Sequence, residues 1–457
     1  MLKQIHKGEQ LSQSGDNREI YLSNFESFEK NLNGGSKSYI HSVRQSAIEQ
    51  FGKYGFPTTK DEEWRFTNIR PLTLRQFSSV NETTITDISK QKIDHLLLKG
   101  LEGNRLVFLN GFLAEQSSEI STTHKNIRIE NLSKILKSNP DFIKKHFTQY
   151  SKQDQSAFTS LNNGFMNDGA VIVIPDNTII NEPFYIAYIS TESSTPFITH
   201  PRTLIIAGNN SQASFVEHYI GPDKNAYFTN AITEISADEG AILTHIKIQT
   251  ESINAYHIGS TFIHQNSGSN VTSNSIMIGG SIARNNLTST LDGERIECTM
   301  NGLSLSTDEQ LIDNHTTINH AKPNCISHEL YKSILDGKSK GVFNGKIFVR
   351  KDAQKTDAKQ TNKTLLLSDN ATMNTKPQLE IFADDVKCTH GATVGYLDAD
   401  SIFYLRSRGI DEAAARDILT YAFANDVVNR IPNKQIQEYV NDILHTRLNQ
   451  SWHIENF

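Results

Sequence analysis

The segment "ADEGAILTHI" (residues 237–246) places small and polar residues directly before a short apolar strand. This pattern decides the fold because it is repeated along the chain. The other copies are "NNSQASFVEH" (residues 209–218), "NSGSNVTSNS" (residues 266–275) and "LDGERIECTM" (residues 291–300), spaced by roughly 25 to 30 residues. A period of this length is typical of stacked turns that bury one continuous core only together. The repeat therefore favours a β-solenoid.

The region around these repeats is rich in strands. From about Ala170 to Tyr404, short β-branched runs alternate with clusters of Gly, Asn, Ser and Asp, and no long helical pattern interrupts them. Such a pattern also suits a sandwich or a barrel. More than 200 residues are large for one sandwich, so we expect a mainly β protein built around a solenoid.

Helical patterns flank this region. In "SYIHSVRQSAIEQF" (residues 38–51) apolar residues recur at helical spacing, and Gly55 and Pro57 end the helix. Trp64, one of two tryptophans, is expected to anchor the core of this small region. We expect three regions, which are an N-terminal helical region at 1–105, a β-helix core at 106–405 and a C-terminal helical region at 406–457.

The C-terminal region predicts two amphipathic helices. Asp411 is a suitable N-cap for the first of them. The expected apolar faces are Ile418, Leu419, Ala422 and Phe423 on the first helix, and Ile436, Tyr439, Val440, Ile443 and Leu444 on the second. Two such helices at the end of a β body form either a cap on the solenoid or a docking surface.

Composition excludes several functions. The chain has 457 residues with 45 basic and 51 acidic side chains, a net charge of −6, which argues against nucleic acid as the main ligand. No apolar run approaches the length of a membrane span, and the first residues lack the apolar core of a signal peptide. Three cysteines make a disulfide framework improbable, so we expect a cytoplasmic protein.

Catalytic motifs are not found in the sequence. The stretch Gly337-Lys338-Ser339 resembles the end of a phosphate-binding loop, but Lys332 stands where the first glycine is needed. No G-x-S-x-G nucleophile elbow occurs. The chain is therefore not expected to be an ATPase or a serine hydrolase.

Two stretches carry potential metal ligands. "DDVKCTHGATVG" (residues 384–395) contains Cys388 two residues before His390, a spacing that puts both side chains on one face of a strand. "NHTTINHAKPNCISHE" (residues 314–329) contains a denser group, which is His315, His320, Cys325 and His328. Neither stretch has a C-x-x-C motif, and three cysteines cannot supply a four-thiolate cluster. The alternatives are a buried thiol beside a structural histidine, and polar solenoid surface.

A long segment, residues 338–410, closely resembles the core of the SufB/SufD proteins of the SUF iron–sulfur assembly system. Supporting matches are "DEEWRFTNI" (61–69), "AFTSLNNGFMNDGAVIVIP" (157–175) and "HELYKSIL" (328–335). The Cys-x-His-Gly-Ala-Thr pattern begins at Cys388, and Leu405 stands where SufB-type chains carry a cysteine. The chain is therefore most similar to SufD.

The resemblance implies a right-handed parallel β-helix flanked by helical regions. It implies a scaffold, not an enzyme, in a complex with a SufB-like subunit and two copies of a SufC-like ATPase. A transient iron–sulfur cluster, or iron, is then held at the SufB–SufD interface, with His390 as ligand and Cys388 as a weaker one. No cofactor is expected on the isolated chain, and a homodimer is the alternative assembly.

The resemblance also places the SufC docking surface on the C-terminal region. The residues implied are Arg408, Gly409, Ile410, Ile418, Tyr421, Ala422 and Phe423. The alternative function, taken from other solenoids, is a polysaccharide-acting β-helix enzyme. That function needs a groove lined by paired carboxylates, whereas the acidic pair Asp384-Asp385 falls at an expected turn.

Overall fold

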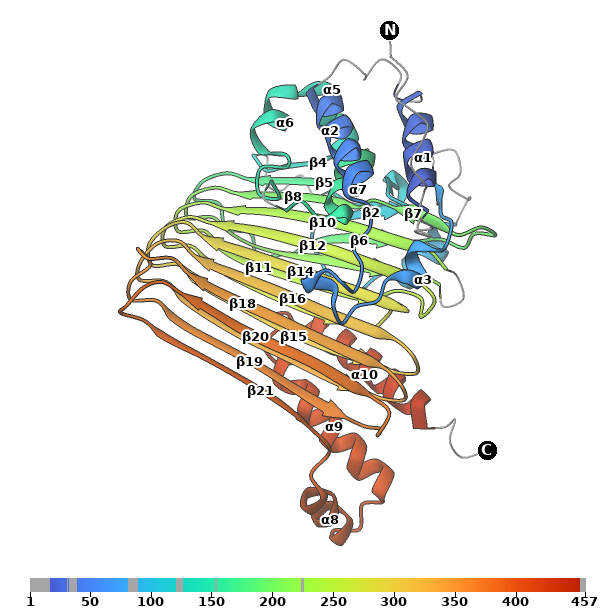
Figure 1. Ribbon diagram of the computed structural model, residues 1–457, viewed down its shortest axis with the longest axis vertical. Helices are drawn as coiled ribbons and strands as arrows, with labels where there is room; N and C mark the ends of the chain where they lie inside the picture. Colours follow the sequence, from blue (N-terminus) through green and yellow to red (C-terminus); the bar gives the residue numbers. More distant parts are fainter. Residues whose placement is uncertain are drawn as a thin grey trace.

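The computed structural model describes residues 17–30, 32, 39–80, 89–120, 126–152, 154–222 and 226–452. Two long β-sheets face each other along most of the molecule, and strands that follow one another in the sequence alternate between them through the solenoid (Figure 1). The predicted β-solenoid with helices at both ends is confirmed.

We name the two sheets A and B. Sheet A consists of β4 (Arg128–Asn131), β5 (Ala170–Ile174), β8 (Arg202–Ala207), β10 (Phe228–Ala237), β12 (Tyr256–Gln265), β14 (Ile282–Leu291), β16 (Leu311–His320), β18 (Lys340–Val349) and β20 (Thr372–Ile381). In addition, β7 (Phe197–Thr199) pairs with β10, and β1 (Ser78–Ser79) pairs with β7. Sheet B consists of β3 (Phe112–Leu113), β2 (Arg105–Leu109), β6 (Phe184–Ile189), β9 (Gln212–Ile220), β11 (Ile242–Thr250), β13 (Asn270–Met277), β15 (Glu297–Ser306), β17 (Ile326–Leu335), β19 (Asp357–Leu366) and β21 (Lys387–Gly395).

The coils of the solenoid stack in register. All strand pairs from β9 to β21 in sheet B are parallel. Successive partners along one line are Gln212, Ile242, Asn270, Glu297, Ile326, Asp357 and Lys387. The chain thus returns to the same place every 27 to 31 residues, close to the spacing of the repeat.

The polar half of the repeat forms the corner that leads from sheet A to sheet B. Asn210, Gly240 and Gly268 occupy equivalent corner positions with φ of 53°, 69° and 68°, a left-handed conformation that Gly and Asn tolerate best. The backbone N–H of Gly240 donates to Ser267 O at 2.9 Å, and that of Gly268 donates to Glu294 O at 2.8 Å. The corners therefore stack on one another as the strands do.

The main core lies between the two sheets. Side chains alternate along each strand, so every second residue points inward, as Phe215, Ile235 and Leu243 do. The outer face of each sheet needs a separate cover, because its own apolar residues would otherwise face water.

N-terminal helices cover the outer face of sheet A over its first strands (Figure 1). They are α1 (Arg18–Lys30), α2 (Tyr39–Tyr54), α5 (Leu132–Ser138), α6 (Pro140–His146) and α7 (Ala157–Phe165), and the shorter elements of this region are η2 (Glu62–Trp64), α3 (Arg70–Thr73), α4 (Lys90–Leu96) and η4 (Glu115–Ser117). Trp64 is buried among these helices and apolar residues of sheet A. Its predicted role as a core anchor is confirmed.

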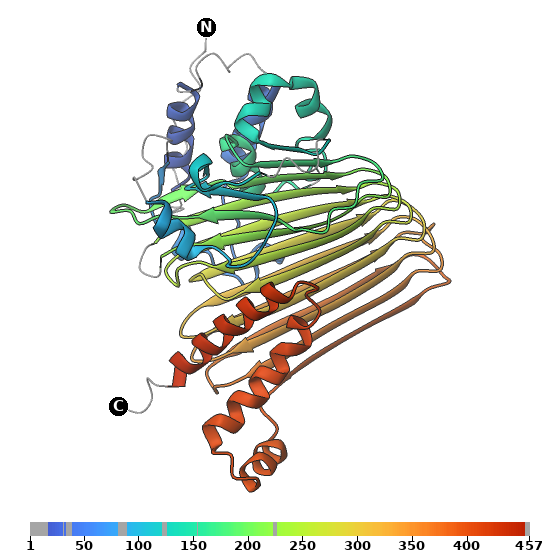
Figure 2. The same ribbon diagram turned by 180° about the vertical axis from the view of Figure 1, so that it is seen from behind.

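C-terminal helices cover the outer face of sheet B (Figure 2). In α10 (Lys434–Trp452) the predicted apolar face is confirmed, since Ile436, Val440 and Leu444 are fully buried. Helix α9 (Glu412–Val428) buries Ala424 and Val427 instead of the predicted face around Ile418. Among the helices that the structure describes, none has the length and apolar character needed to cross a membrane.

The end of the solenoid differs from the predicted boundary at residue 405. Strand β21 ends at Gly395, and α8 (Ala399–Ser407) follows, which contains no buried residue and projects from the body. The side chain of Asp398 accepts a hydrogen bond from the backbone N–H of Ser401 at 2.9 Å and so begins this helix. Helices α5 to α7 likewise lie inside the range expected for the core.

In-register stacking makes glycine indispensable at some inward positions. A Cβ at Gly302 would lie 2.2 Å from the ring of Tyr331, its partner on the next coil. Gly302→Ala is expected to lower the free energy of unfolding by about 1 to 3 kcal/mol, because a buried ring must shift. Urea unfolding measures this change. The matched control is Gly391→Ala, where a Cβ meets nothing within 4 Å, and equal losses in both variants would contradict the argument.

Candidate functional site: the open end of the solenoid

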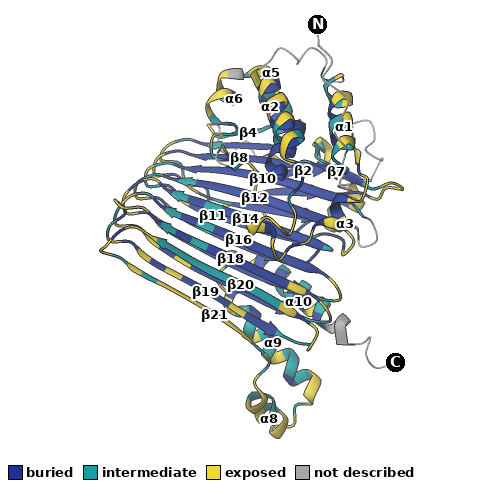
Figure 3. Cartoon of the chain, viewed as in Figure 1, coloured by how far each residue is buried: buried dark blue, intermediate teal, exposed yellow. Residues whose placement is uncertain are grey.

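The C-terminal end of the solenoid has two unpaired strand edges. Within the described ranges, β20 ends the order of sheet A and β21 ends that of sheet B, so each pairs on one side only. Exposure rises toward this end (Figure 3). Large apolar side chains are exposed there, namely Ile381, Phe382, Val394 and Tyr396. An exposed edge with apolar side chains is suited to pairing with another chain.

Strand β21 carries both predicted ligands of the principal site. Cys388 and His390 pair in register with Ala358 and Gln360 of β19, whose side chains are buried in the interior. Both therefore project toward the interior, on one face as predicted. His390 is nevertheless exposed, because in the described part of the chain no further coil follows β21. Cys388 is half-buried and packs in an apolar cluster with Ile347 and its neighbours.

The thiols of the chain are poorly disposed to bind metal. Burial raises the pKa of Cys388 and of Cys325, and it raises the pKa of Cys298 to about 12. A metal ligand must be the thiolate, which burial in apolar surroundings disfavours. Of the two predicted ligands, Cys388 is thus the one whose metal-binding form is disfavoured by burial.

The second predicted group of ligands is not brought together. His315 lies on the outer face of sheet A, His320 lies between the sheets, and His328 is exposed on the outer face of sheet B. The Cys325 thiol donates to Gly293 O at 3.2 Å at a corner. Within the described part of the chain, no group of three or more His, Cys, Asp or Glu side chains is arranged to hold a metal ion.

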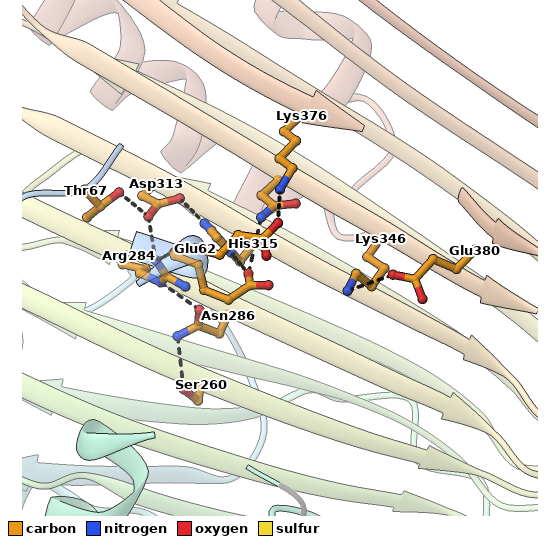
Figure 4. A network of polar contacts seen from close by, with 12 residues as sticks. Glu62, Thr67, Ser260, Arg284, Asn286, Asp313, His315, Lys346, Lys376 and Glu380 are labelled. Carbon is orange, nitrogen blue, oxygen red and sulfur yellow. Dashed lines mark hydrogen bonds and ion pairs between the residues drawn. The ribbon is translucent and has the colours of Figure 1, made fainter. Parts of the chain in front are cut away.

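His315 instead joins the N-terminal region to sheet A (Figure 4). Its Nε2 lies 3.0 Å from Asp313 Oδ1, and its Nδ1 lies 3.3 Å from Glu63 Oε2. The Arg284 guanidinium pairs with Asp313 at 3.0 Å and stacks over the Trp64 ring at 3.8 Å. The segment that carries Trp64 is thus held on the solenoid by ion pairs.

These contacts favour the charged form of His315. Burial is the largest single influence and lowers the pKa of His315, but the Asp313 and Glu63 carboxylates together outweigh it, and the net effect is a raised pKa. The pKa of Glu63 is lowered by its hydrogen bond to His315. Burial raises the pKa of Asp313, but the charges of His315 and Arg284 lower it by more, and the net effect is a lowered pKa. Both ring nitrogens of His315 face carboxylates, and metal binding needs the neutral imidazole that these contacts disfavour, so we interpret His315 as a structural residue.

Sequence reasoning missed two residues beneath His390. Glu329 and Gln360 lie in the interior on β17 and β19, and in-register pairing aligns them with His390 in one column. Gln360 Nε2 donates to Glu329 Oε2 at 2.5 Å. Burial raises the pKa of Glu329 to about 7. The repeat could have pointed to them, because Glu329, Gln360 and His390 follow one another along the sequence at intervals of about one repeat period.

Comparisons with known proteins identify the family to which the chain belongs. The family model described as "SUF system FeS cluster assembly, SufBD core domain" matches residues 188–423, and the one described as "SufBD protein N-terminal region" matches residues 15–186. The chain therefore belongs to the SufBD family of the SUF system of iron–sulfur cluster assembly.

Several curated relatives span nearly the same length. A SufBD family protein of Synechocystis is 32% identical over 89% of this chain and 90% of its own. The iron–sulfur cluster assembly protein SufD of Escherichia coli is 31% identical over 87% of this chain and 90% of its own. The chloroplastic protein ABCI7 of Arabidopsis thaliana is 29% identical over 90% of this chain and 87% of its own.

The raised pKa of His315 predicts a pH-dependent contribution to stability. The contribution is complete below the pKa of an unfolded histidine, about 6.5, and is lost as pH rises through the higher folded value. His315→Asn is expected to lower the free energy of unfolding by about 1 to 3 kcal/mol at pH 6, and by less at pH 8.5. Urea unfolding at both values tests this, with His328→Asn as the exposed control. A loss that is equal at both pH values would contradict it.

Proposed function

We propose that this chain is a SufD-like, non-catalytic scaffold subunit. Its open end pairs with a SufB-like subunit, a nascent iron–sulfur cluster is assembled at the shared interface and handed on, and a SufC-like ATPase drives the cycle in the cytoplasm. The observation that carries the proposal is the exposed His390 on the last strand, between two unpaired sheet edges. In isolation, the same edges would support a homodimer.

The chemistry of the open end suits a cargo that is released again. Four thiolates hold a cluster tightly, whereas a mixed set of Cys and His ligands from two chains holds it less tightly. This chain offers an imidazole at His390, with Cys388 as the weaker ligand because burial favours its protonated thiol. The remaining thiolate ligands would come from the partner. The isolated chain then needs no resident cofactor.

The exposed residues of the C-terminal helices support the proposal that a SufC-like ATPase docks there. Of the residues implied by the resemblance, Arg408, Gly409, Ile418 and Ala422 are exposed, and Ile410, Tyr421 and Phe423 are half-buried. Helix α8 adds Phe403 and Tyr404, which are 73% and 57% exposed. Apolar side chains left uncovered on a projecting element are typical of a protein interface.

Helix α9 is also fastened to the solenoid. Lys332 Nζ of β17 donates to Phe423 O at 3.0 Å, pairs with Asp426 at 2.9 Å and lies over the Phe423 ring at 4.4 Å. Movement of a docked ATPase would therefore act on the strand that also carries Glu329. Domain-level movements of this kind are a common way to open an interface.

The polysaccharide alternative gains no support from the acidic pair on which it rested. Asp384 and Asp385 are exposed at a corner, where Asp385 forms an ion pair with Lys355. A glycosidase needs its two carboxyl groups on either side of a bound sugar. Adjacent residues at a solenoid corner, one of them neutralised, do not provide that arrangement.

The ligand role of His390 is tested on the complex. His390→Ala, co-expressed with the SufB-like and SufC-like subunits, is expected to leave the complex intact and to lower the yield of cluster at least about tenfold. Anaerobic reconstitution followed by absorbance spectroscopy measures the yield. His328→Ala, an exposed histidine away from the open end, is the matched control. An unchanged yield with His390→Ala would refute the assignment.

The docking surface is tested separately. Ile418→Asp places a charge on the exposed side of α9, where Ile418 is 46% exposed, and is expected to abolish co-purification of the SufC-like subunit because the charge would be buried unpaired. Thermal unfolding of the isolated chain should not change. Glu412→Gln, at the start of the same helix, serves as the control. Full retention of the SufC-like subunit by Ile418→Asp would contradict this surface.

A further inference from the structure

Gln360 is held in a defined position beneath the open end. Its side chain is buried at 1% exposure, and its Nε2 donates to Glu329 Oε2 at 2.5 Å. Gly345 faces it from sheet A, and a Cβ at Gly345 would lie 2.4 Å from Gln360 Nε2. A glycine on one side and a carboxylate on the other thus fix the plane and the direction of this amide.

The amide oxygen of Gln360 has no hydrogen-bond partner, although it is buried. Leaving a buried acceptor unsatisfied is unfavourable, so such an atom calls for an explanation. The residue that pairs with Gln360 on the next strand is His390. Neighbouring strands lie about 4.8 Å apart, so rotation of the exposed His390 ring can bring an N–H to the Gln360 Oε1 atom, although the two are not hydrogen-bonded in this structure.

We propose that Gln360 is a positioning residue for His390, accepting a hydrogen bond from one ring N–H and thereby directing the lone pair of the other ring nitrogen to the interface. Glu329 acts one coil further in, by holding the Gln360 amide with its oxygen toward His390. The inference rests on the proposed function, in which His390 binds the cluster. Histidines that bind metal usually donate their second N–H to a carbonyl or carboxylate, which selects the tautomer.

Few other groups in the interior could select the tautomer. The titratable side chains at nearby inward positions are Glu329 and Tyr331 on β17 and Cys388 on β21. The inward positions facing them from sheet A are Phe343, Gly345, Thr375 and Pro377, none of which titrates. Glu329 is separated from His390 by Gln360 in the column. The amide is therefore the group best placed to orient the ring.

The experiment measures the tautomer of His390 in the full-length chain. Two-bond ¹H–¹⁵N spectra of ¹⁵N-histidine-labelled protein at pH 8 report which ring nitrogen carries the proton, and His390→Ala assigns the signal. The wild-type chain is expected to show one tautomer. Gln360→Met keeps the approximate shape but removes the acceptor, and is expected to give the mixture of an unconstrained imidazole. The matched control is Asn362→Leu, a buried amide whose partner on β21 is Ala392, which should leave the signal unchanged.

A second readout is the cluster yield on the co-purified complex. Gln360→Met is expected to lower it about tenfold, as loss of a partner behind a metal ligand commonly does, with the subunits still associated. Glu329→Gln retains an acceptor for the Gln360 amide and is expected to behave like the wild type, whereas Glu329→Met is expected to lose the single tautomer. If Gln360→Met fails to fold, Gln360→Asn is the substitute. Its side chain is one methylene shorter, so its amide oxygen lies farther from His390 and the same loss of the single tautomer is expected.

The outcomes separate this inference from the proposed function. A wild-type His390 that already shows a tautomer mixture, or a Gln360→Met signal identical to the wild type, overturns the positioning role. An unchanged cluster yield with His390→Ala overturns the proposed function, while the tautomer measurement still decides whether the hydrogen bond exists. A tautomer that changes in Gln360→Met together with a lost yield supports the inference.

Discussion

In-register pairing of successive coils is the constraint on which the rest of the structure depends. Each long strand bonds to its counterpart one coil earlier over nearly its whole length, as β16 does with β18 and β17 with β19. A residue therefore has as its closest inward neighbours the residues one period before and after it. The interior becomes a set of columns, and the chemistry of a position follows from the column in which it lies.

A stack of this kind must end, and each end poses a different problem. N-terminal helices pack over the first coils, and α9 and α10 pack over sheet B. Among the described residues, no helix covers the last coil and no further strand pairs with it, so the column that contains His390 ends at the solvent-exposed surface. His390 and the unpaired edges of β20 and β21 are thus in one place, for a single topological reason.

The sequence predicted those features of the fold and the site whose pattern lies within a short stretch of the chain. The solenoid followed from its repeat, and the buried face of α10 followed from helical spacing, since both are visible within one short window. The group from His315 to His328 failed to form a site because it spans a corner, and residues near one another in the chain then point to different faces. The face of α9 around Ile418 was wrongly predicted to be buried, because an apolar stripe on a helix does not show whether it packs against its own chain or against a partner. Gln360 was missed because its neighbours in space are one full period away.

The corners and the strands respond differently to changes of length. The corner between β10 and β11 has four residues and that between β18 and β19 has seven, yet the strands on both sides keep their register. Insertions are therefore accommodated at corners, where evolution can lengthen a loop without moving a column. One residue gained or lost within β21 ahead of His390 would instead turn every later side chain of that strand to the opposite face. Length variation among related chains should accordingly be concentrated at the corners and be rare in the last strand.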